Sequence, residues 1–188
     1  MTTIVVVRKA GSAVIAADSL TTFGTTRLGP AYDRYPQKIT AYGDSFLGVA
    51  GSAAHQLVLE NLLVRVKDLD FHGKGAIYES FRKLHPLLKD EAFLNPKEEE
   101  DDPYESSQMT VMIANPSGIF AVYSMREVFE FDRFWAIGSG RDFALGAMYT
   151  IYPRAKSAAA VAEAGVLAGA EFDTGTSTPI TLHEVGVG

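Results

Sequence analysis

Residues 2–19 read T-T-I-V-V-V-R-K-A-G-S-A-V-I-A-A-D-S and contain two short apolar runs. The first run, Ile4–Val7, is β-branched, and the second, Ala13–Ala17, ends beside Asp18. Gly11-Ser12 lies between them, and a glycine-containing turn between two such runs is typical of a β-hairpin. We therefore expect a hairpin here, with a second strand that reaches Asp18.

The following stretch predicts a loop, a second hairpin and two helices. Residues 19–37 are rich in Thr, Gly, Pro and Tyr, which favours a loop. Apolar runs at residues 39–42 and 46–50 flank Gly43-Asp44 and predict the hairpin. Ser52 is a candidate N-cap. Helical spacing then predicts two buried faces, formed by Val58, Leu62, Val66 and Leu69 and by Ile77, Phe81, Leu84 and Leu88.

The second half of the chain predicts more strands, two helices and a last strand. The acidic segment 90–107 is expected to be a solvated surface loop. Strands are expected over residues 108–114, 118–123, 128–131, 134–137 and 179–185, and helices after Gly138-Ser139-Gly140 and over 157–170. This order predicts an α+β fold of two sheets with helices outside them, in a single domain over residues 1–188.

The composition excludes several classes of function. The chain has 188 residues, a net charge of −6 and no cysteine. An acidic chain is poorly suited to bind nucleic acid, and the lack of cysteine excludes disulfides and a cysteine nucleophile. The four histidines show no ligand spacing, so we expect no metal and no cofactor. No apolar run reaches the roughly 20 residues of a membrane span, and no signal peptide is evident. We expect a cytoplasmic protein that does not contact a membrane.

Thr2 follows the initiator methionine, and its small side chain predicts that Met1 is removed. Removal leaves a free α-amine, with a pKa of about 7.7–8.0, on a residue that carries a β-hydroxyl. Such an amine is partly neutral near physiological pH and can act as the base for its own hydroxyl. Many proteins begin with Met-Thr, so Thr2 alone does not identify a nucleophile.

Four segments in the same order resemble proteasome β-subunits and the bacterial peptidase HslV. Residues 2–19 resemble their mature N-terminus, and Gln37-Lys38-Ile39 resembles their lysine-bearing strand. Residues 48–54 (G-V-A-G-S-A-A) resemble the turn into their first helix, and residues 136–144 (A-I-G-S-G-R-D-F-A) resemble a later strand–helix segment. The resemblance extends from residue 2 to about residue 177. It implies the four-layer αββα sandwich of N-terminal-nucleophile hydrolases.

The resemblance also implies a catalytic group. Thr2 is expected to attack a peptide carbonyl and form an ester. Lys38 is expected to lie beside it and assist its proton transfer, and Asp18 to hold Lys38 by a charge-assisted hydrogen bond. Gly51 is expected to donate its backbone N–H to the oxyanion. Taken without the resemblance, Asp18 fits a turn cap and Lys38 a solvated strand lysine equally well.

Ser139 and Asp173 match positions that orient the terminal amine and a water molecule. Ser139 also fits a helix N-cap. Asp173-Thr174-Gly175-Thr176 fits the family's D-x-x-[ST]-G only loosely, because its glycine is displaced. The resemblance therefore supports Asp173 more firmly than Thr176.

Four further residues are implied to bind substrate. Thr22 matches the residue whose backbone pairs with the substrate as an added strand. Thr21, Val49 and Ala53 match positions that line the specificity pocket, and none of them is charged. This favours an apolar side chain before the cleaved bond.

Family members form rings of six or seven subunits that stack in pairs around an inner chamber. The N-terminus most resembles HslV and the small bacterial proteasome homologues of the BPH type. This favours seven-fold rings and a homo-oligomer of about 14 subunits. The implied partners are peptides or unfolded proteins and an ATP-dependent unfoldase. Two alternatives remain open, a small-molecule amidase of the same fold and a catalytically silent ring-forming homologue.

Overall fold

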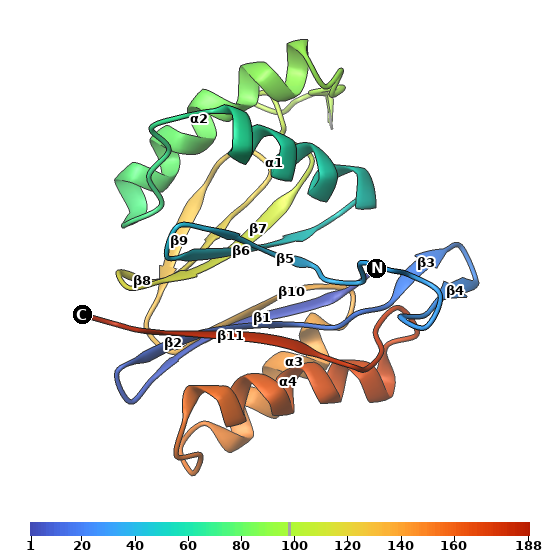
Figure 1. Cartoon of the computed structure of the whole chain (residues 1–188), viewed down its shortest axis with the longest axis vertical. Helices are drawn as coiled ribbons and strands as arrows, with labels where there is room; N and C mark the ends of the chain where they lie inside the picture. Colours follow the sequence, from blue (N-terminus) through green and yellow to red (C-terminus); the bar gives the residue numbers. More distant parts are fainter. Residues whose placement is uncertain (98) are drawn as a thin grey trace.

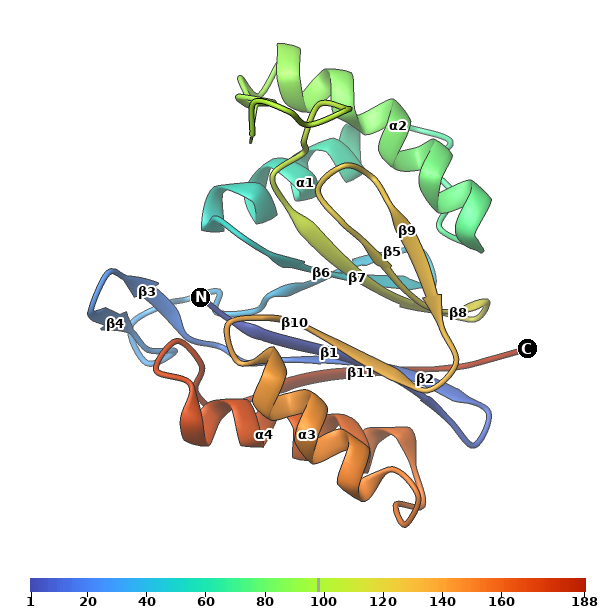
Figure 2. The ribbon, with the colours of Figure 1, turned by 180° about the vertical axis from the view of Figure 1, so that it is seen from behind.

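The computed structural model describes residues 1–97 and 99–188, and Glu98 of the predicted acidic loop lies outside the described residues. Two stacked β-sheets form the middle of the molecule, and a pair of helices covers the outer face of each (Figure 1). The view from behind shows the same four layers (Figure 2). The arrangement confirms the predicted αββα sandwich.

The first sheet contains the N-terminal hairpin and has the antiparallel strand order β10-β1-β2-β11. Its strands are β1 (Thr3–Lys9), β2 (Ser12–Ala17), β10 (Phe134–Gly138) and β11 (Thr181–Gly186). Helices α3 (Arg141–Ile151) and α4 (Ala158–Phe172) cover it. Both faces of β1 are buried, which explains its unbroken apolar sequence. Ile4 and Val6 pack between the two sheets, whereas Val5 and Val7 pack against α3 and α4.

The second sheet has the antiparallel order β5-β6-β7-β8-β9. Its strands are β5 (Ile39–Tyr42), β6 (Ser45–Ala50), β7 (Thr110–Asn115), β8 (Gly118–Val122) and β9 (Val128–Phe131). Helices α1 (Ala53–Arg65) and α2 (Lys74–Asp90) cover it. Ser52 caps α1 as predicted, since its hydroxyl accepts a hydrogen bond from the Ala54 N–H at 3.3 Å.

Helix α1 ends earlier than the apolar spacing predicted. Val66 is extended, with φ −87° and ψ 122°, and Asp68 has a positive φ of 61°. The chain therefore turns after Arg65. Leu69 nevertheless remains buried in the same apolar cluster as Leu62, because the turn returns it to that cluster. The prediction that Leu69 is buried is confirmed, whereas the prediction that it is helical is wrong.

The predicted loop 19–37 contains a short hairpin. Strands β3 (Thr21–Phe23) and β4 (Thr26–Leu28) pair as a two-stranded sheet around Gly24, which has a φ of +60°. The abundant threonines favour strand, and glycine accommodates the turn. The hairpin projects from the body of the molecule beside the N-terminus (Figure 1), and its tip contains the exposed Phe23.

The segment between α2 and β7 is exposed for most of its described length, as predicted for an acidic loop. The end of this segment is held against α2, because Glu105 pairs with His85 and Lys89 of that helix. Ser106 and Ser107 are buried next to this contact. Within the described residues, no helix is both long enough and apolar enough to cross a membrane.

Candidate active site

Thr2, Asp18 and Lys38 meet where three strands begin or end. Strands β1 and β2 are antiparallel with Ile4 opposite Ala17, so the residue before β1 and the residue after β2 lie at the same end of the sheet. Lys38 immediately precedes β5 of the facing sheet. Each of these residues is at least nine-tenths buried, so their charges interact with little screening by solvent.

The Thr2 hydroxyl hydrogen-bonds to both of the other side chains. It donates to Asp18 Oδ1 at 2.6 Å and accepts from the Lys38 ammonium at 2.8 Å. Lys38 Nζ also donates to Asp18 Oδ1 at 2.7 Å and to the Leu20 carbonyl at 2.6 Å. The hydroxyl oxygen is therefore held against a buried ammonium, an arrangement that can stabilise negative charge on that oxygen.

Backbone N–H groups fix the Asp18 carboxylate. Oδ1 accepts from Thr3 N at 3.0 Å, and Oδ2 accepts from Leu20 N at 3.0 Å and Ser177 N at 3.3 Å. Burial lowers the pKa of Lys38 below its ordinary value, although the charge and hydrogen bond of Asp18 oppose this shift. Lys38 is thus more ready to release a proton than an exposed lysine.

Ser139 and Asp173 form a second polar group at the backbone nitrogen of Thr2. Thr2 N donates to Ser139 Oγ at 3.2 Å, and Ser139 Oγ donates to Asp173 Oδ2 at 2.6 Å. Burial raises the pKa of Asp173, but hydrogen bonds from Ser139 and Thr176 outweigh it and keep the pKa below its ordinary value. The carboxylate is therefore charged, and Ser139 links it to the Thr2 nitrogen.

The alternative reading of Ser139 as a helix N-cap is wrong. Gly140 occupies the N-cap position of α3, and no side chain caps this helix. The Ser139 hydroxyl is instead directed to Asp173 and to the Thr2 carbonyl, which it reaches at 3.3 Å. Ser139 is therefore part of the polar group around Thr2.

Solved structures resemble this fold over its full length. The BPH of Thiobacillus denitrificans is 39% identical with a TM-score of 0.92, and the match covers 99% of this chain and 98% of that one. The same protein in complex with epoxomicin is 37% identical with a TM-score of 0.92, and the match covers 99% of both chains. The chain belongs to the BPH family, which has the proteasome-type N-terminal-nucleophile hydrolase fold.

A more distant structure, HslV from Trypanosoma brucei, shares the fold of this BPH-family chain. It is 18% identical with a TM-score of 0.69, and the match covers 98% of this chain and 99% of that one. No protein-family model matches the chain. No curated protein matches it either.

Gly51 of this BPH-family chain lies between β6 and α1 and has a φ of +144°. A side chain there is disfavoured by the backbone, and a Cβ would also lie 3.1 Å from His55 Nδ1. Gly51 is thus an exposed glycine at the predicted turn, and its oxyanion role stays a prediction. Within the described residues, Gly51 makes no side-chain hydrogen bond to the group around Thr2.

The four residues predicted to bind substrate are close in sequence to Asp18 or Gly51 but make no hydrogen bond to Thr2. Thr21 and Thr22 lie in β3, whose backbone pairs with β4 along one edge. Val49, in β6, is half-buried against the apolar cluster under α1, and Ala53 is exposed as the first residue of α1. Their binding roles remain predictions.

Thr176 belongs to the site more clearly than its sequence suggested. Its hydroxyl donates to Asp173 Oδ2 at 2.6 Å and lies 2.7 Å from Thr3 Oγ1. The displaced glycine obscured this match, because the spacing from Asp173 to Thr176 fits the family's pattern and only the following glycine is lacking. Backbone groups of Leu20 and Ser177 also form part of the site, and nothing in a side-chain pattern could identify them.

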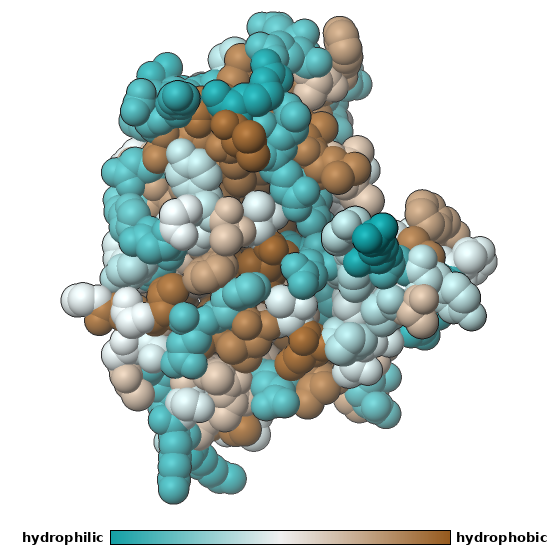
Figure 3. Space-filling view, viewed as in Figure 1, coloured by the Kyte–Doolittle hydropathy of each residue, from teal (hydrophilic) through white to brown (hydrophobic). Residues whose placement is uncertain are grey.

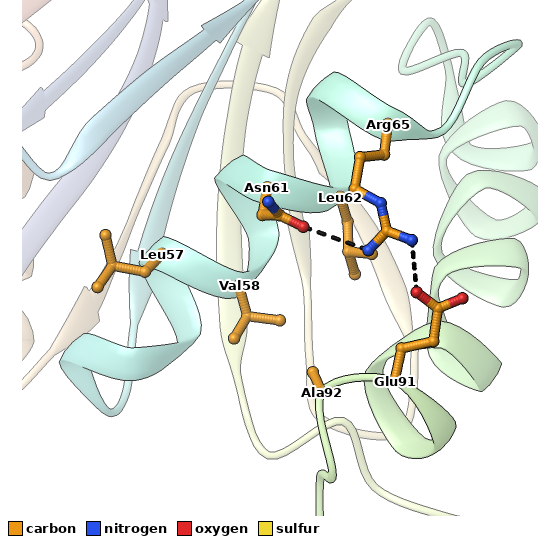
Figure 4. Close-up of a pocket in the computed structure, with 7 residues that line it drawn as sticks. All are labelled: Leu57, Val58, Asn61, Leu62, Arg65, Glu91 and Ala92. Atoms are coloured by element: carbon orange, nitrogen blue, oxygen red, sulfur yellow. Dashed lines mark hydrogen bonds and ion pairs between the residues drawn. The ribbon is translucent and has the colours of Figure 1, made fainter.

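The described surface includes two hollows of different size. One lies between α1 and the segment after α2, with a volume of about 210 Å³, and Arg65 bridges it to Glu91 at 2.6 Å (Figure 4). It is in the outer helical layer and contains no residue of the Thr2 group. The other adjoins Gly51 and Gly138 and is larger, about 520 Å³. Among the described residues, no cluster of three or more His, Asp or Glu side chains could hold a metal ion.

Proposed function

We propose that this chain is a threonine-type endopeptidase subunit that hydrolyses peptide bonds once Met1 has been removed. The observation that carries the proposal is the position of the Thr2 hydroxyl, which lies 2.6 Å from Asp18 and 2.8 Å from Lys38 in a buried site. A structural threonine does not require a buried lysine with a lowered pKa beside its oxygen. A threonine nucleophile does.

Thr2 first loses its hydroxyl proton as Oγ1 attacks the carbonyl carbon of the substrate. The free amine that replaces the Thr2 amide accepts this proton, directly or through a water, and passes it to the leaving amine. Lys38 stabilises the developing negative charge on Oγ1, and Asp18 holds Lys38 in place. The ester formed on Thr2 is then hydrolysed by water, which restores the hydroxyl.

Ser139 and Asp173 position the amine in this mechanism. Ser139 accepts a hydrogen bond from the Thr2 nitrogen at 3.2 Å and is itself fixed by Asp173 at 2.6 Å. A negative Asp173 favours the protonated amine between proton transfers. Gly51 donates its N–H to the carbonyl oxygen as that oxygen becomes negative.

The substrate binds as an extended strand along β3, through the backbone of Thr22. The side chain before the cleaved bond enters a pocket formed by Thr21, Val49 and Ala53, which are uncharged. We therefore expect cleavage after apolar residues.

The subunit works in a cytoplasmic homo-oligomer of two stacked rings, about 14 subunits in all, around a closed chamber. Enclosure limits hydrolysis to chains that enter the chamber, and an ATP-dependent unfoldase would deliver folded substrates. Sedimentation of the purified protein tests the assembly. A monomer or dimer that hydrolyses only small amides contradicts it and supports the amidase alternative.

Epoxomicin, which is bound by the BPH of Thiobacillus denitrificans, provides a direct test of the nucleophile. Intact mass spectrometry of the purified protein is expected to show loss of Met1 and one epoxomicin per processed chain, attached at Thr2. Thr2→Ala is expected to remove both the adduct and the cleavage of unfolded protein. Thr150→Ala is the matched control, because this exposed threonine of α3 bonds only to the Gly146 carbonyl.

Two results would contradict the proposal. In the first, Met1 is removed completely and Thr2 still forms no adduct, which would favour a catalytically silent ring protein. In the second, Thr2→Ala cleaves peptides as fast as the unchanged protein.

A further inference from the structure

The larger hollow lies on one particular side of Thr2. Strand β1 has β10 on one side and β2 on the other, and β2 leads into β3. The hollow is lined by residues of β10 and of the start of α3, together with Thr110 of the facing sheet and Gly51, which follows strand β6 of that sheet. It is therefore on the β10 side of Thr2, opposite to the proposed substrate strand along β3.

This topology determines which part of a peptide reaches the hollow. A peptide whose carbonyl is held by Gly51, and whose preceding residues pair with β3, must continue towards β10 after the cleaved bond. Gly51 itself lines the hollow, so the hollow borders the residue that is proposed to hold the carbonyl. The volume of about 520 Å³ lies within the roughly 300–1,000 Å³ of typical ligand pockets.

A rigid aromatic surface forms one wall. The Trp135 indole stacks on Phe131, with ring centroids 5.2 Å apart and an interplanar angle of 11°. Its Nε1 donates to the Tyr123 hydroxyl at 2.8 Å, and Tyr123 lines the hollow beside it. The indole is thus held on one face and at its nitrogen, and 36% of the residue remains exposed. A fixed, accessible aromatic ring binds another flat apolar group at little entropic cost.

The remaining lining combines buried or half-buried apolar residues with an exposed pair of charges. Ile137 and Leu145 line the hollow, together with Arg141 and Asp142. These two charges are paired, with Arg141 Nε 3.4 Å from Asp142 Oδ1, and both side chains are mostly exposed. A neutral, apolar group therefore fits this lining better than a charged one.

We propose that this hollow binds the side chain of the first residue after the cleaved bond and prefers an aromatic or large apolar residue there. This inference rests on the proposed peptidase function. It adds a second specificity pocket on the leaving-group side, in which Trp135 is the main contact. Trp135 is a specificity-determining residue and takes no part in proton transfer.

Internally quenched peptides that differ only in the residue after the cleaved bond test this pocket. The unchanged protein is expected to cleave the peptide with Phe at this position about tenfold more efficiently, in kcat/KM, than peptides with Gly or Asp. Trp135→Ala is expected to reduce this ratio to near one, and Trp135→Phe to retain part of it. Phe93→Ala removes an exposed aromatic residue outside the hollow and should leave the ratio unchanged.

The rate of epoxomicin addition separates the two proposals, because this inhibitor has no residue beyond its electrophile. Trp135→Ala is expected to react with it at the rate of the unchanged protein, which also shows that the variant is folded. Normal epoxomicin addition with the same Phe preference in Trp135→Ala would overturn the pocket alone. Equal cleavage of all the peptides by the unchanged protein would also overturn it. Failure of epoxomicin to add to the unchanged protein would overturn the peptidase function and, with it, the pocket.

Discussion

Gly138 lies directly against the backbone of Thr2. It stands opposite Thr3 in the β1–β10 pairing and has a φ of +91°. A Cβ at this position would be 2.1 Å from the Thr2 carbonyl oxygen and 2.8 Å from its carbonyl carbon. The close approach sets the position of Thr2 between β10 and Asp18, so the glycine is required both by its backbone angle and by its neighbour.

Gly138→Ala is therefore expected to displace the nucleophile. A shift of about 1 Å at a reacting group lowers rates about 100-fold, so epoxomicin addition should slow by at least this factor. Unfolding should also become easier by about 1–3 kcal/mol, because alanine is strained at this φ. Gly146→Ala is the matched control. Gly146 lies within α3 with open space around it, so alanine should preserve the rate and stabilise the helix slightly. Unchanged reactivity of Gly138→Ala would show that the contact is not needed.

Replacing Lys38 with methionine is expected to affect both reactivity and stability. The substitution removes the cation beside Thr2 Oγ1, and loss of a group that stabilises negative charge in the transition state lowers rates about 10²–10³-fold. It also leaves the buried Asp18 carboxylate without its ion pair, which costs about 3–5 kcal/mol of unfolding free energy. Epoxomicin kinetics and urea unfolding measure the two effects. Arg65→Met removes an exposed ion pair and should change neither. A Lys38→Met protein with wild-type kinetics would exclude Lys38 from the mechanism.

Asp173→Asn is expected to shift the pH dependence of epoxomicin addition to lower pH. The Asp173 carboxylate raises the pKa of Lys38, and it is linked to the Thr2 nitrogen through Ser139, so it favours the protonated form of both cations. Removing its charge lowers both pKa values, and the neutral, reactive amine then persists to lower pH. The rate measured across pH 5–9 tests this shift, with the exposed Asp132→Asn as the control. A shift to higher pH would contradict the assignment of Asp173.

Two histidines are expected to change the pH dependence of stability in opposite directions. His183 stacks on Phe46 at 4.5 Å, and burial lowers its pKa. The folded state therefore prefers neutral His183, and stability is lost as the pH falls below the ordinary value of about 6.5. His183→Phe should remove this loss. The free energy of unfolding of the variant, relative to that of the unchanged protein, should therefore be larger at pH 5 than at pH 8.

His72 provides the opposite case. The hydrogen bond with Asp70 raises the pKa of His72. The contribution of His72 to stability is therefore complete below about pH 6.5 and is lost as the pH rises through the folded-state pKa. His72→Gln should therefore lose stability at pH 5 relative to pH 8. Urea unfolding at both pH values measures the two variants, and slopes of the same sign would contradict the assignments.

Much of the fold was predictable because the apolar residues of β1 and β2 are so regular. The same N-terminal segment, with Lys38, predicted the residues that meet at Thr2. Conformations set by distant parts of the chain were not predictable. Helical spacing continued through Val66, although the chain turns there, and the β3–β4 hairpin was hidden in a stretch rich in turn residues.

The partners of Ser139 were indicated only by the family resemblance and not by the local sequence. A serine between two glycines before a helix fits an N-cap by local pattern, and only the packing of α4 beside β1 brings Asp173 to its hydroxyl. The hollow beside Trp135 was not predictable either, because segments that are distant in sequence form it. Its walls come from segments around residues 50, 110, 123, 135 and 141, which no local pattern connects.

Strand β1 has hydrogen-bonded neighbours on both sides and packs between two apolar layers, and Thr2 immediately precedes it. Chain ends usually fray independently of the domain they belong to. Here the first residues can leave their places only if the sheet opens, so their amide protons should exchange by cooperative unfolding. Reactivity at Thr2 would then measure the native population, and an electrophile that labels this threonine could serve as a probe of folding in mixtures of native and denatured chains.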